Sequence, residues 1–442
     1  MDVDKTNLRE AAVAIVRELQ QAGFIAYWAG GCVRDRLLGI VPKDYDVATN
    51  ATPDEVVKLF PRSTVVGKNF GVVVAPFCGF NFEVATFRED LDYEDGRRPI
   101  GVVFVTPEED AKRRDFTINA MFFDPISVVL HDFVGGQDDL AAKCVRCVGD
   151  ASRRFAEDHL RMLRAVRFAS RLGFEISAET ADAIRVHAAL IAKISKERIQ
   201  VELTRTFLEA ERPGQALILM ESLGLLEVVL PEVAVMRDQE QPPQFHPEGD
   251  VLTHTALMLD DMAYRDPVLV YATLFHDIGK PPTAVDDGTR IRFNGHAEVG
   301  AKMAHRIMRG FRFPTQVIDD VARCVRSHMQ FMDVQKMRKS TLRRMLGRDT
   351  FEKEMELHRL DCSSSHGLLD NYEFLKSAQE EMANEPVLPP HWVNGRDIMG
   401  LGVRKGPEVG RWIRVAYDAQ LNGEYPDREA MLEWLEGEIA GG

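Results

Sequence analysis

Two aspartates one residue apart, Asp44 and Asp46, stand near the end of "YWAGGCVRDRLLGIVPKDYDVATN", residues 27–50. Residues i and i+2 of a strand point to the same face, so the spacing predicts two carboxylates side by side. Such a pair needs a cation, and a hard divalent ion such as Mg²⁺ suits oxygen ligands. Two such ions can activate an attacking hydroxyl and stabilise a leaving pyrophosphate. A solvated strand edge is the common alternative for this short pattern.

The same stretch holds groups that suit a phosphate. Gly30 and Gly31 lie between an apolar run and "VRDRLLG", where glycines let backbone N–H groups approach a phosphate near a helix N-terminus. Arg34 can anchor a phosphate or pair with Asp35. Glu83, in "NFEVATF", supplies a third carboxylate if its strand lies alongside the aspartates. A plain strand-to-helix turn is the alternative for the two glycines.

A compact cationic segment, "KRRDFTINA", spans residues 112–120. Arg113 and Arg114 suit phosphate oxygens, because a guanidinium presents a planar fork of donors. Asp115 and Asn119 stand four residues apart and can reach a sugar hydroxyl. The alternative is an aspartate that caps a helix, with solvated charges on either side.

The segment "EDHLRMLRAVRF", residues 157–168, reads as one helix that places Asp158 and Arg161 on one face. A carboxylate accepts a hydrogen bond from the exocyclic amine of cytosine or adenine, and a guanidinium donates to the ring nitrogen. Guanine and uracil present a carbonyl and a ring N–H instead, so they mismatch both groups. The pair can therefore select C and A. The alternative is an exposed ion pair, which contributes little.

These motifs occur in an order that resembles the class II tRNA nucleotidyltransferase/poly(A) polymerase family over about residues 25–210. They are "GGCVRDRLLG", "DYDVAT", "EVATFR", "RRDFTINA", "DFVGG" and "EDHLRMLRAVRFASRLGF". The resemblance implies an α+β nucleotidyltransferase head related to DNA polymerase β, followed by all-α neck, body, HD and tail regions. It also implies addition of CCA to tRNA 3′ ends without a nucleic-acid template.

The resemblance further assigns the site residues. Asp44 and Asp46 are expected to be catalytic and to hold two Mg²⁺ ions. The expected nucleotide pocket comprises Gly30, Gly31, Arg34, Arg113, Arg114, Asp115, Asn119, Glu157, Asp158, Arg161 and Arg164. The segment "LDYEDGRRP", residues 91–99, resembles the flexible loop used in switching to the final A addition.

Histidines gather in the second half of the chain, where eight of the twelve fall between residues 246 and 366. Adjacent His and Asp ligands with further histidines can surround divalent ions with nitrogen and oxygen donors. A lone His-Asp pair is usually a cap or an ion pair. The order of these residues along the chain, a histidine, an adjacent His-Asp pair, two further histidines and an aspartate, resembles the HD superfamily of metal phosphohydrolases. This resemblance implies phosphatase or 2′,3′-cyclic phosphodiesterase activity. The implied ligands of a divalent transition metal or Mg²⁺ are His254, His276, Asp277, His296, His328 and Asp361.

The elements that must position these residues divide the chain of 442 residues into several domains. A helical pattern over residues 8–22 and short β-rich runs predict the head over 1–140. Helical patterns predict a neck and body over 141–235, which carry the base-reading pair and bind tRNA. They resume in the HD domain over 245–380 and in a helical tail over 381–442.

Composition limits the partners and the compartment. The net charge of −14 argues against a generally adhesive nucleic-acid binder, but residues 153–212 carry 12 Lys/Arg and 9 Asp/Glu. Such a local basic surface can hold tRNA. The polar N-terminus, the lack of a membrane-spanning apolar run and six scattered cysteines predict a cytoplasmic protein.

The sequence thus predicts an enzyme that adds C, C and A to tRNA from CTP and ATP and has a second, phosphohydrolase activity in its HD domain. The tRNA 3′ hydroxyl attacks the α-phosphate and pyrophosphate leaves. An A-adding enzyme or a bacterial poly(A) polymerase is the alternative, whereas segment 91–99 disfavours a CC-only enzyme. A different class is an HD phosphohydrolase with an RNA-binding head. A tRNA-binding protein without activity fits least, because both sets of metal-binding carboxylates are complete. The oligomeric state is left open.

Overall fold

The computed structural model describes residues 5–66, 71–91, 93–94, 98–99, 101–241, 247–288, 291–382 and 386–441. The chain forms two compact units. The first is Met1–Val235 with Gly310–Arg312, and the second is Met236–Arg309 with Phe313–Gly442. The division into four domains stays a prediction, since the contacts within the chain define these two units.

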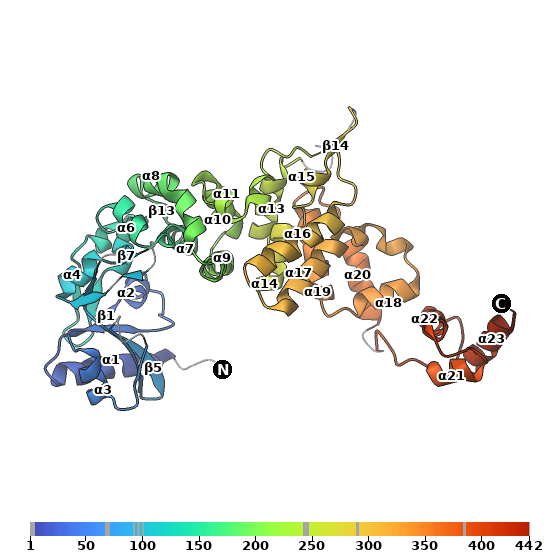
Figure 1. The fold of residues 1–442 in the computed structure, drawn as a ribbon, viewed down its shortest axis with the longest axis horizontal. Coiled ribbons are helices and arrows are strands. Elements are labelled where there is room, and N and C mark those ends of the chain that lie inside the picture. Colours follow the sequence, from blue (N-terminus) through green and yellow to red (C-terminus); the bar gives the residue numbers. More distant parts are fainter. Residues whose placement is uncertain are drawn as a thin grey trace. The chain divides into compact units, whose positions relative to one another are not determined.

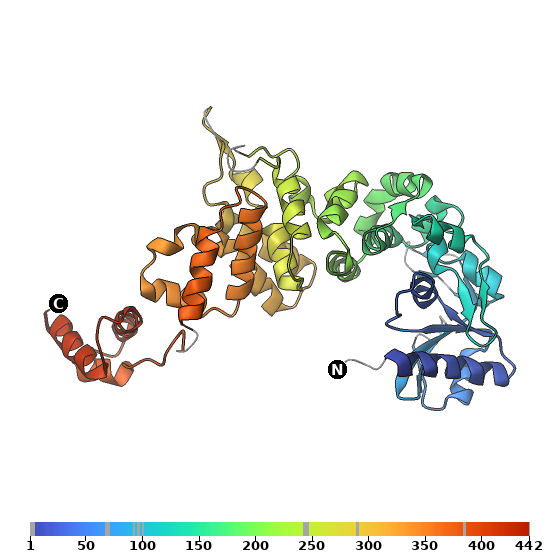
Figure 2. The same cartoon turned by 180° about the vertical axis from the view of Figure 1, so that it is seen from behind.

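The first unit begins with a mixed seven-stranded sheet in the order β11-β10-β1-β2-β5-β4-β3 (Figures 1 and 2). β2 and β5 pair in parallel, and the other neighbouring strands pair antiparallel. The strands are β1 (Ala26–Ala29), β2 (Asp46–Thr49), β3 (Thr64–Val65), β4 (Val72–Phe77), β5 (Phe80–Thr86), β10 (Phe122–Asp124) and β11 (Val129–His131). The α+β head is therefore present as predicted.

Helices α1 (Lys5–Gln21) and α3 (Pro53–Leu59) pack on this sheet (Figure 1). The helical spacing of the apolar residues in α1 buries Ala12, Ile15, Val16 and Leu19 completely. Trp28 of β1 donates from its indole Nε1 to the carbonyl of Ala12 at 2.9 Å, which ties the helix to the strand. Because side chains alternate along a strand, the residues on either side of Trp28 in β1 point to the opposite face of the sheet.

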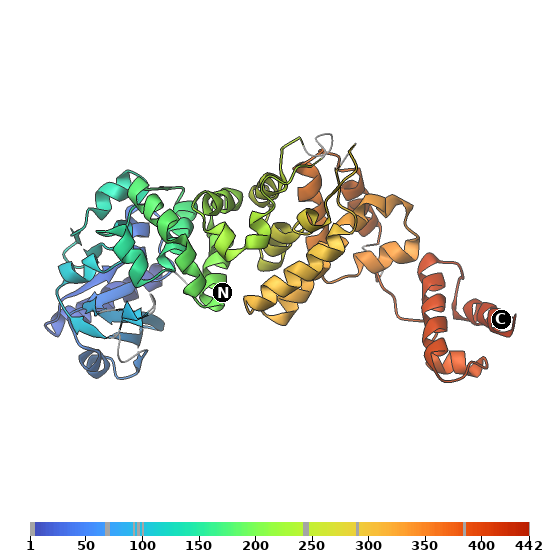
Figure 3. The ribbon, with the colours of Figure 1, turned by 45° about the horizontal axis from the view of Figure 1, so that its top comes forward.

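The remainder of the first unit is largely helical, as predicted, apart from short strand pairs (Figure 3). The small strands are β6 (Arg88–Asp90), β7 (Tyr93–Glu94), β8 (Arg98–Pro99), β9 (Val102–Phe104), β12 (Cys144–Val145) and β13 (Glu175–Ile176). The helices are α2 (Gly31–Leu37), α4 (Pro107–Lys112), η2 (Thr117–Asn119), α5 (Gly136–Ala141), α6 (Ala151–Glu157), α7 (Arg161–Leu172), α8 (Ala178–His187), η3 (Ala188–Lys193), α9 (Lys196–Glu209), α10 (Pro213–Ser222), α11 (Leu226–Val229) and α12 (Pro231–Ala234).

In its described residues the second unit is helical except for one antiparallel strand pair, β14 (Val285–Asp286) with β15 (Ile291–Arg292). Its helices are α13 (Val251–Asp260), α14 (Pro267–Phe275), α15 (Lys280–Thr283), α16 (His296–Gly310), α17 (Thr315–Ser327), η4 (His328–Lys336), α18 (Lys339–Leu346), α19 (Phe351–Ser363), α20 (Asp370–Glu381), α21 (Gly395–Gly400), α22 (Pro407–Asn422) and α23 (Arg428–Gly441). Across the described ranges, no helix combines the length and apolarity that a membrane crossing requires.

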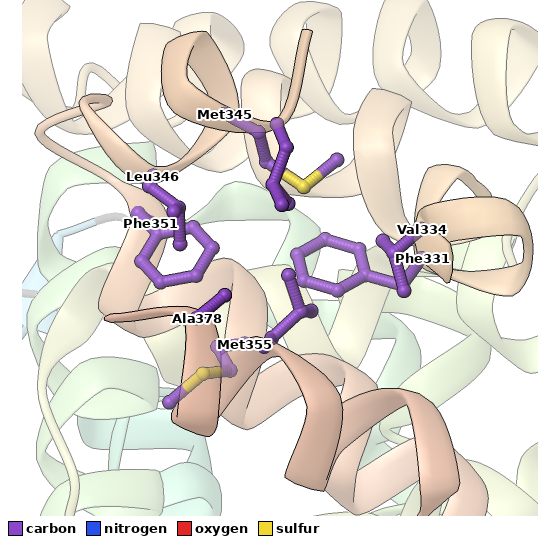
Figure 4. Packing of buried hydrophobic residues seen from close by; sticks show 9 residues of the cluster. Phe331, Val334, Met345, Leu346, Phe351, Met355 and Ala378 are labelled. Carbon is purple, nitrogen blue, oxygen red and sulfur yellow. The ribbon is translucent and has the colours of Figure 1, made fainter. Parts of the chain in front are cut away.

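Two apolar clusters hold separate parts of the second unit together. One gathers Phe331 of η4 with Met345 of α18, Phe351 of α19 and Ala378 of α20, so that four elements share a core (Figure 4). The other joins α21, α22 and α23 and includes Ile398, which is fully buried. The last three helices therefore have their own core.

Candidate functional site

A cavity of about 520 Å³ in the first unit collects most of the predicted nucleotide-site residues. Those that line it are Gly30, Gly31, Arg34, Asp44, Asp46, Arg113, Arg114, Asp115, Asn119, Asp158, Arg161 and Arg164. Of the predicted set only Glu157 is absent from the lining. Residues from four separate sequence segments therefore face one space.

The sequence suggested that both aspartates at the sheet edge belong to one strand, but only one of them does. Asp46 is the first residue of β2, and Asp44 precedes the strand. Desolvation, with the nearby charges of Asp44 and Glu83, raises the pKa of Asp46 to about 6, against a smaller opposing effect of Arg114. Crowding of carboxylates without a cation has this effect, so the donor set fits a divalent metal.

Glu83 comes to this edge through the parallel pairing of β2 and β5. Val47 lies opposite Val84 in the register, which puts Asp46 and Glu83 at the same level of neighbouring strands. Glu83 does not line the cavity itself. The negative charge of Glu83 nevertheless contributes to the raised pKa of Asp46, so the two carboxylates interact electrostatically. A role as third metal ligand stays a prediction.

The glycine turn connects β1 to α2, the predicted strand-to-helix junction. Gly30 has φ 72° and ψ −130°, a conformation that favours glycine. A Cβ there would lie 3.4 Å from Nη1 of Arg114, so the backbone and a cation of the cavity approach closely. The turn leaves room at the cavity wall for a ligand to approach the main chain.

Arg34 is buried and forms the ion pair with Asp35 that was one of its two predicted roles, whereas phosphate binding stays a prediction. Its Nε and Nη2 donate to Oδ1 of Asp35 at 2.8 and 2.6 Å. Its Nη1 donates to Oδ1 of Asn119 at 2.6 Å. Arg171 of α7 donates to the other oxygen of Asp35 at 3.1 Å. Arg34 therefore lines the cavity while it orients Asn119.

The segment 112–120 is organised by ion pairs rather than by a helix cap. Asp110 binds the guanidinium groups of Arg113 at 2.7 Å and Arg114 at 3.0 Å. Asp115 is buried and accepts from Nε and Nη2 of Arg164 at 2.9 and 2.5 Å. Burial alone would raise the pKa of Asp115, but the Arg164 guanidinium holds it at about 2. Asp115 therefore stays ionised and fixes Arg164 at the cavity wall.

The prediction of one continuous helix over 157–168 is wrong, because α6 ends at Glu157 and α7 begins at Arg161. Asp158 between them is extended, with φ −142° and ψ 104°. Its Oδ1 accepts from the backbone N–H of Leu160 at 3.1 Å, a local bond that competes with helix continuation. Asp158 and Arg161 nevertheless line the same cavity.

Asp158 and Arg161 do not form the ion pair that was the alternative to base reading. Nη1 of Arg161 donates to Oε2 of Glu157 at 2.8 Å. Oδ2 of Asp158 instead accepts from Nη2 of Arg198 at 2.9 Å. Arg161 is only 8% exposed, so its guanidinium is held rather than mobile. Glu157 thus positions Arg161 from outside the cavity.

Seven further residues complete the wall: Asp35, Lys43, Arg167, Phe168, Arg171, Arg205 and Glu209. Nine cations face six carboxylates in the whole lining, which suits a polyanionic ligand. The arginines of α7 recur every three or four residues from Arg161 to Arg171, a helical spacing visible in the sequence. Arg205 on α9 carries no such local signal.

The predicted loop over 91–99 lies partly outside the described residues. Positions 92, 95–97 and 100 are not described. The described backbone forms an antiparallel pair between β7 and β8, with Tyr93 opposite Pro99. The switching role of this segment stays a prediction.

The second site gathers the predicted HD residues within the second unit. His276 and Asp277 follow α14, His254 lies on α13 and Asp361 lies on α19. His254, His276 and Asp277 form one buried group with ligand atoms within 4.8 Å of one another, and Asp277 forms another with His296 and His328. Nε2 of His254 lies 3.1 Å from Oδ1 of Asp361, which connects the sixth residue.

Backbone carbonyls fix the orientation of three of these imidazoles. Nδ1 of His276, His296 and His328 lies 2.6–2.8 Å from a main-chain oxygen. Only a protonated Nδ1 can donate there, so in the neutral form of such a ring the lone pair lies on Nε2. Burial lowers the pKa of His328 to about 4 and also lowers that of His296, so both rings are neutral near pH 7.

Two of these lone pairs then face each other. Nε2 of His296 lies 3.1 Å from Nε2 of His328, and neither carries a proton to share. Asp277 stands beside them, with Oδ1 3.4 Å from Nε2 of His296. Although burial raises the pKa of Asp277, His276 and Lys280 hold it well below its usual value. Converging lone pairs beside an ionised carboxylate fit a divalent cation.

Gly279→Ala should damage this second site. A Cβ at Gly279 would clash with the carbonyl oxygen of His296 and lie 2.8 Å from the backbone nitrogen of Gly300. Both are backbone atoms of α16, so we expect destabilisation of about 1–3 kcal/mol and weaker metal binding. Gly310→Ala is the control, since a Cβ there meets nothing within 4 Å. Thermal unfolding and metal titration of both variants measure the difference, and equal behaviour would contradict the prediction.

A mixed sheet with carboxylates at one strand edge, beside an arginine-lined cavity, defines a nucleotidyltransferase head, and the His/Asp cluster defines an HD domain. Matches to known families agree: a poly(A) polymerase head domain over residues 26–146, a probable RNA- and SrmB-binding site of polymerase A over 173–236, and an HD domain over 250–362. The chain belongs to the CCA-adding enzyme family.

Individual relatives support this assignment. A CCA-adding enzyme of Geobacillus thermodenitrificans is 38% identical over 70% of this chain and 68% of its own length. A CCA-adding enzyme of Bacillus licheniformis is 32% identical over 96% of this chain and 97% of its own length. The crystal structure of the Bacillus stearothermophilus CCA-adding enzyme in complex with CTP has a TM-score of 0.76 and 28% identity and covers 98% of each chain.

Proposed function

We propose that this chain adds C, C and A to the 3′ end of tRNA, using CTP and ATP and releasing pyrophosphate. One observation carries the proposal. The carboxylates at the sheet edge, Asp44 and Asp46, open onto the same cavity as Asp158 and Arg161. A nucleotide held there can offer its base to one pair while its phosphates meet the other. The family of the chain and the CTP complex of its Bacillus stearothermophilus relative support the choice of substrates.

The roles of the residues follow from their positions. Asp44 and Asp46, with Glu83 as a third candidate, would hold two Mg²⁺ ions. Such ions lower the pKa of an attacking hydroxyl and neutralise a leaving pyrophosphate. Arg113 and Arg114, the latter beside Gly30, bind the triphosphate, and Arg34 holds Asn119 in position to contact the sugar.

Base choice rests on the two groups between α6 and α7. Asp158 accepts from the exocyclic amine of C or A, and Arg161 donates to the ring nitrogen. Arg161 is kept in place by Glu157, so this donor does not move with each nucleotide. Because both groups are protein side chains, no nucleic-acid template is needed.

Asp158→Ala should relax nucleotide choice. The variant loses the acceptor for the amine of C and A, while Arg161 still donates to the carbonyls of U and G. An unsatisfied buried polar group costs about 1–3 kcal/mol, which corresponds to a roughly five- to hundred-fold loss of selectivity. Measuring kcat/KM for CTP, ATP, UTP and GTP on a transcript ending before CCA tests it. Unchanged ratios would mean that this pair does not read the base.

Transcripts that end before CCA, after C and after CC separate full addition from the alternatives. Each is incubated with one nucleotide at a time, and the ends are sequenced. Full CCA addition predicts C onto the first two and A onto the third. An A-adding enzyme extends only the third, and a poly(A) polymerase continues beyond one A.

For the second site we propose a metal-dependent phosphohydrolase acting on a phosphate monoester or a 2′,3′-cyclic phosphate. His254, His276, Asp277, His296, His328 and Asp361 would hold a divalent transition metal or Mg²⁺. A bound ion of this kind supplies a nucleophilic hydroxide at neutral pH. The converging Nε2 atoms of His296 and His328 are the observation that favours it.

A further inference from the structure

The carboxylate of Asp158 is held by an arginine from a distant part of the sequence. Nη2 of Arg198, in α9, donates to Oδ2 of Asp158 at 2.9 Å, forty positions along the chain. The two side chains are 28% and 19% exposed. Arg198 does not line the nucleotide cavity, whereas Asp158 does. The base-reading carboxylate is therefore held by a residue outside the cavity lining.

Asp158 needs such support because its backbone is irregular. It lies between α6 and α7 in an extended conformation. Its Oδ1 accepts from the N–H of Leu160 at 3.1 Å, and this bond alone leaves Oδ2 free to rotate out of position. A charge-assisted bond from a guanidinium fixes the second oxygen. Each carboxylate oxygen has two lone pairs, so Oδ2 keeps one for the amine of an incoming base.

The ion pair is not needed to hold α9 in place. Ile199, Leu203 and Phe207 of this helix are almost fully buried in the core. Glu202 also binds Arg167 of α7 at 2.7 Å. The second terminal nitrogen of Arg198, Nη1, is buried and makes no hydrogen bond to the described residues. Among the described residues, Asp158 is thus the charged group with which Arg198 forms an ion pair.

We propose that Arg198 is a positioning residue for nucleotide choice, which orients the Asp158 carboxylate toward the base edge of CTP and ATP. The proposal rests on the proposed role of Asp158 in base reading. Arg198 acts through Asp158 and touches no substrate, so its loss loosens the acceptor without removing it. The expected defect is therefore one of selectivity.

Arg198→Met tests this, with kcat/KM measured for the four nucleotides on a transcript ending before CCA. The CTP:UTP ratio should fall roughly three- to tenfold, less than in Asp158→Ala, because the acceptor remains. Arg198→Lys should restore part of the ratio, since an ammonium keeps the charge but not the planar fork. Arg185→Met is the control, because Arg185 forms an exposed ion pair with Asp182 on α8. Its ratio should match wild type.

The double variant Asp158→Ala with Arg198→Met distinguishes the outcomes. If Arg198 acts through Asp158, the double variant has the same ratio as Asp158→Ala alone. An unchanged ratio in Asp158→Ala refutes the base-reading role itself. If the CTP:UTP ratio of kcat/KM changes in Asp158→Ala but stays at the wild-type value in Arg198→Met, only the positioning role is refuted. The same holds if Arg198→Met loses kcat/KM equally for all four nucleotides. If Arg198→Met does not fold, the uncharged variant Arg198→Gln replaces it, and a wild-type ratio in that variant counts against the proposal.

Discussion

Asp46→Asn is expected to abolish nucleotide addition. Asp46 begins β2 and faces the cavity with Asp44, so its amide replacement removes one of the two carboxylates that would hold the metal ions. Asparagine keeps the shape and hydrogen-bonding oxygen of the side chain but not its charge. The chemical step should slow at least about 10³-fold, since metal-held groups supply several kcal/mol of transition-state stabilisation.

Single-turnover extension of a transcript ending before CCA, with CTP and excess Mg²⁺, measures this loss. Asp124→Asn is a matched control, because Asp124 lies on β10 of the same sheet but outside the cavity lining. It should extend tRNA at the wild-type rate. Near wild-type extension by Asp46→Asn would refute the catalytic assignment.

The same substitution should not destabilise the metal-free fold. The pKa of Asp46 is raised to about 6 in the folded chain, above its ordinary value. A raised carboxyl pKa stabilises the fold below about pH 4 and loses that contribution as the pH rises through the folded value. Asp46→Asn should therefore match wild type at pH 4 and gain roughly 0.5 kcal/mol at pH 7, limited by solvent screening. Denaturant unfolding in a chelator at both values tests the sign.

Asp277→Asn should remove hydrolysis of phosphate monoesters and 2′,3′-cyclic phosphates. Asp277 belongs to both groups of potential metal ligands, so its carboxylate is shared by the whole cluster. Loss of that charge leaves Asp361 as the remaining carboxylate of the predicted ligand set, and a site with one anionic ligand fewer binds divalent ions less tightly. We expect activity to fall below detection and bound metal to be lost on dialysis.

Nucleotide addition by Asp277→Asn should persist, because the two sites lie in separate compact units. His305→Asn is the matched control: this histidine is about half exposed on α16 and stands outside the ligand groups. Metal analysis and assays of both activities on each variant give the answer. Retained hydrolysis in Asp277→Asn, or a wild-type protein without bound metal, would refute the second site.

What the sequence by itself determined is the identity of the chemical groups. Asp44 and Asp46 are separated by one residue, and His276 and Asp277 are adjacent, so short-range spacing was enough to reveal each pair. Short β-rich runs followed by helical periodicity also predicted an α+β head and a largely helical remainder. These signals are local, and local patterns survive in any arrangement of the chain.

Only the tertiary structure decided which groups meet. The helix break at Asp158 depends on a side-chain bond to Leu160, and its second oxygen binds Arg198, forty residues away. Parallel pairing of β2 with β5 brings Glu83 level with Asp46, and helix packing sets Nε2 of His296 against that of His328. Such contacts arise when separate apolar faces pack together, and residue spacing along the chain does not encode the distance between those faces.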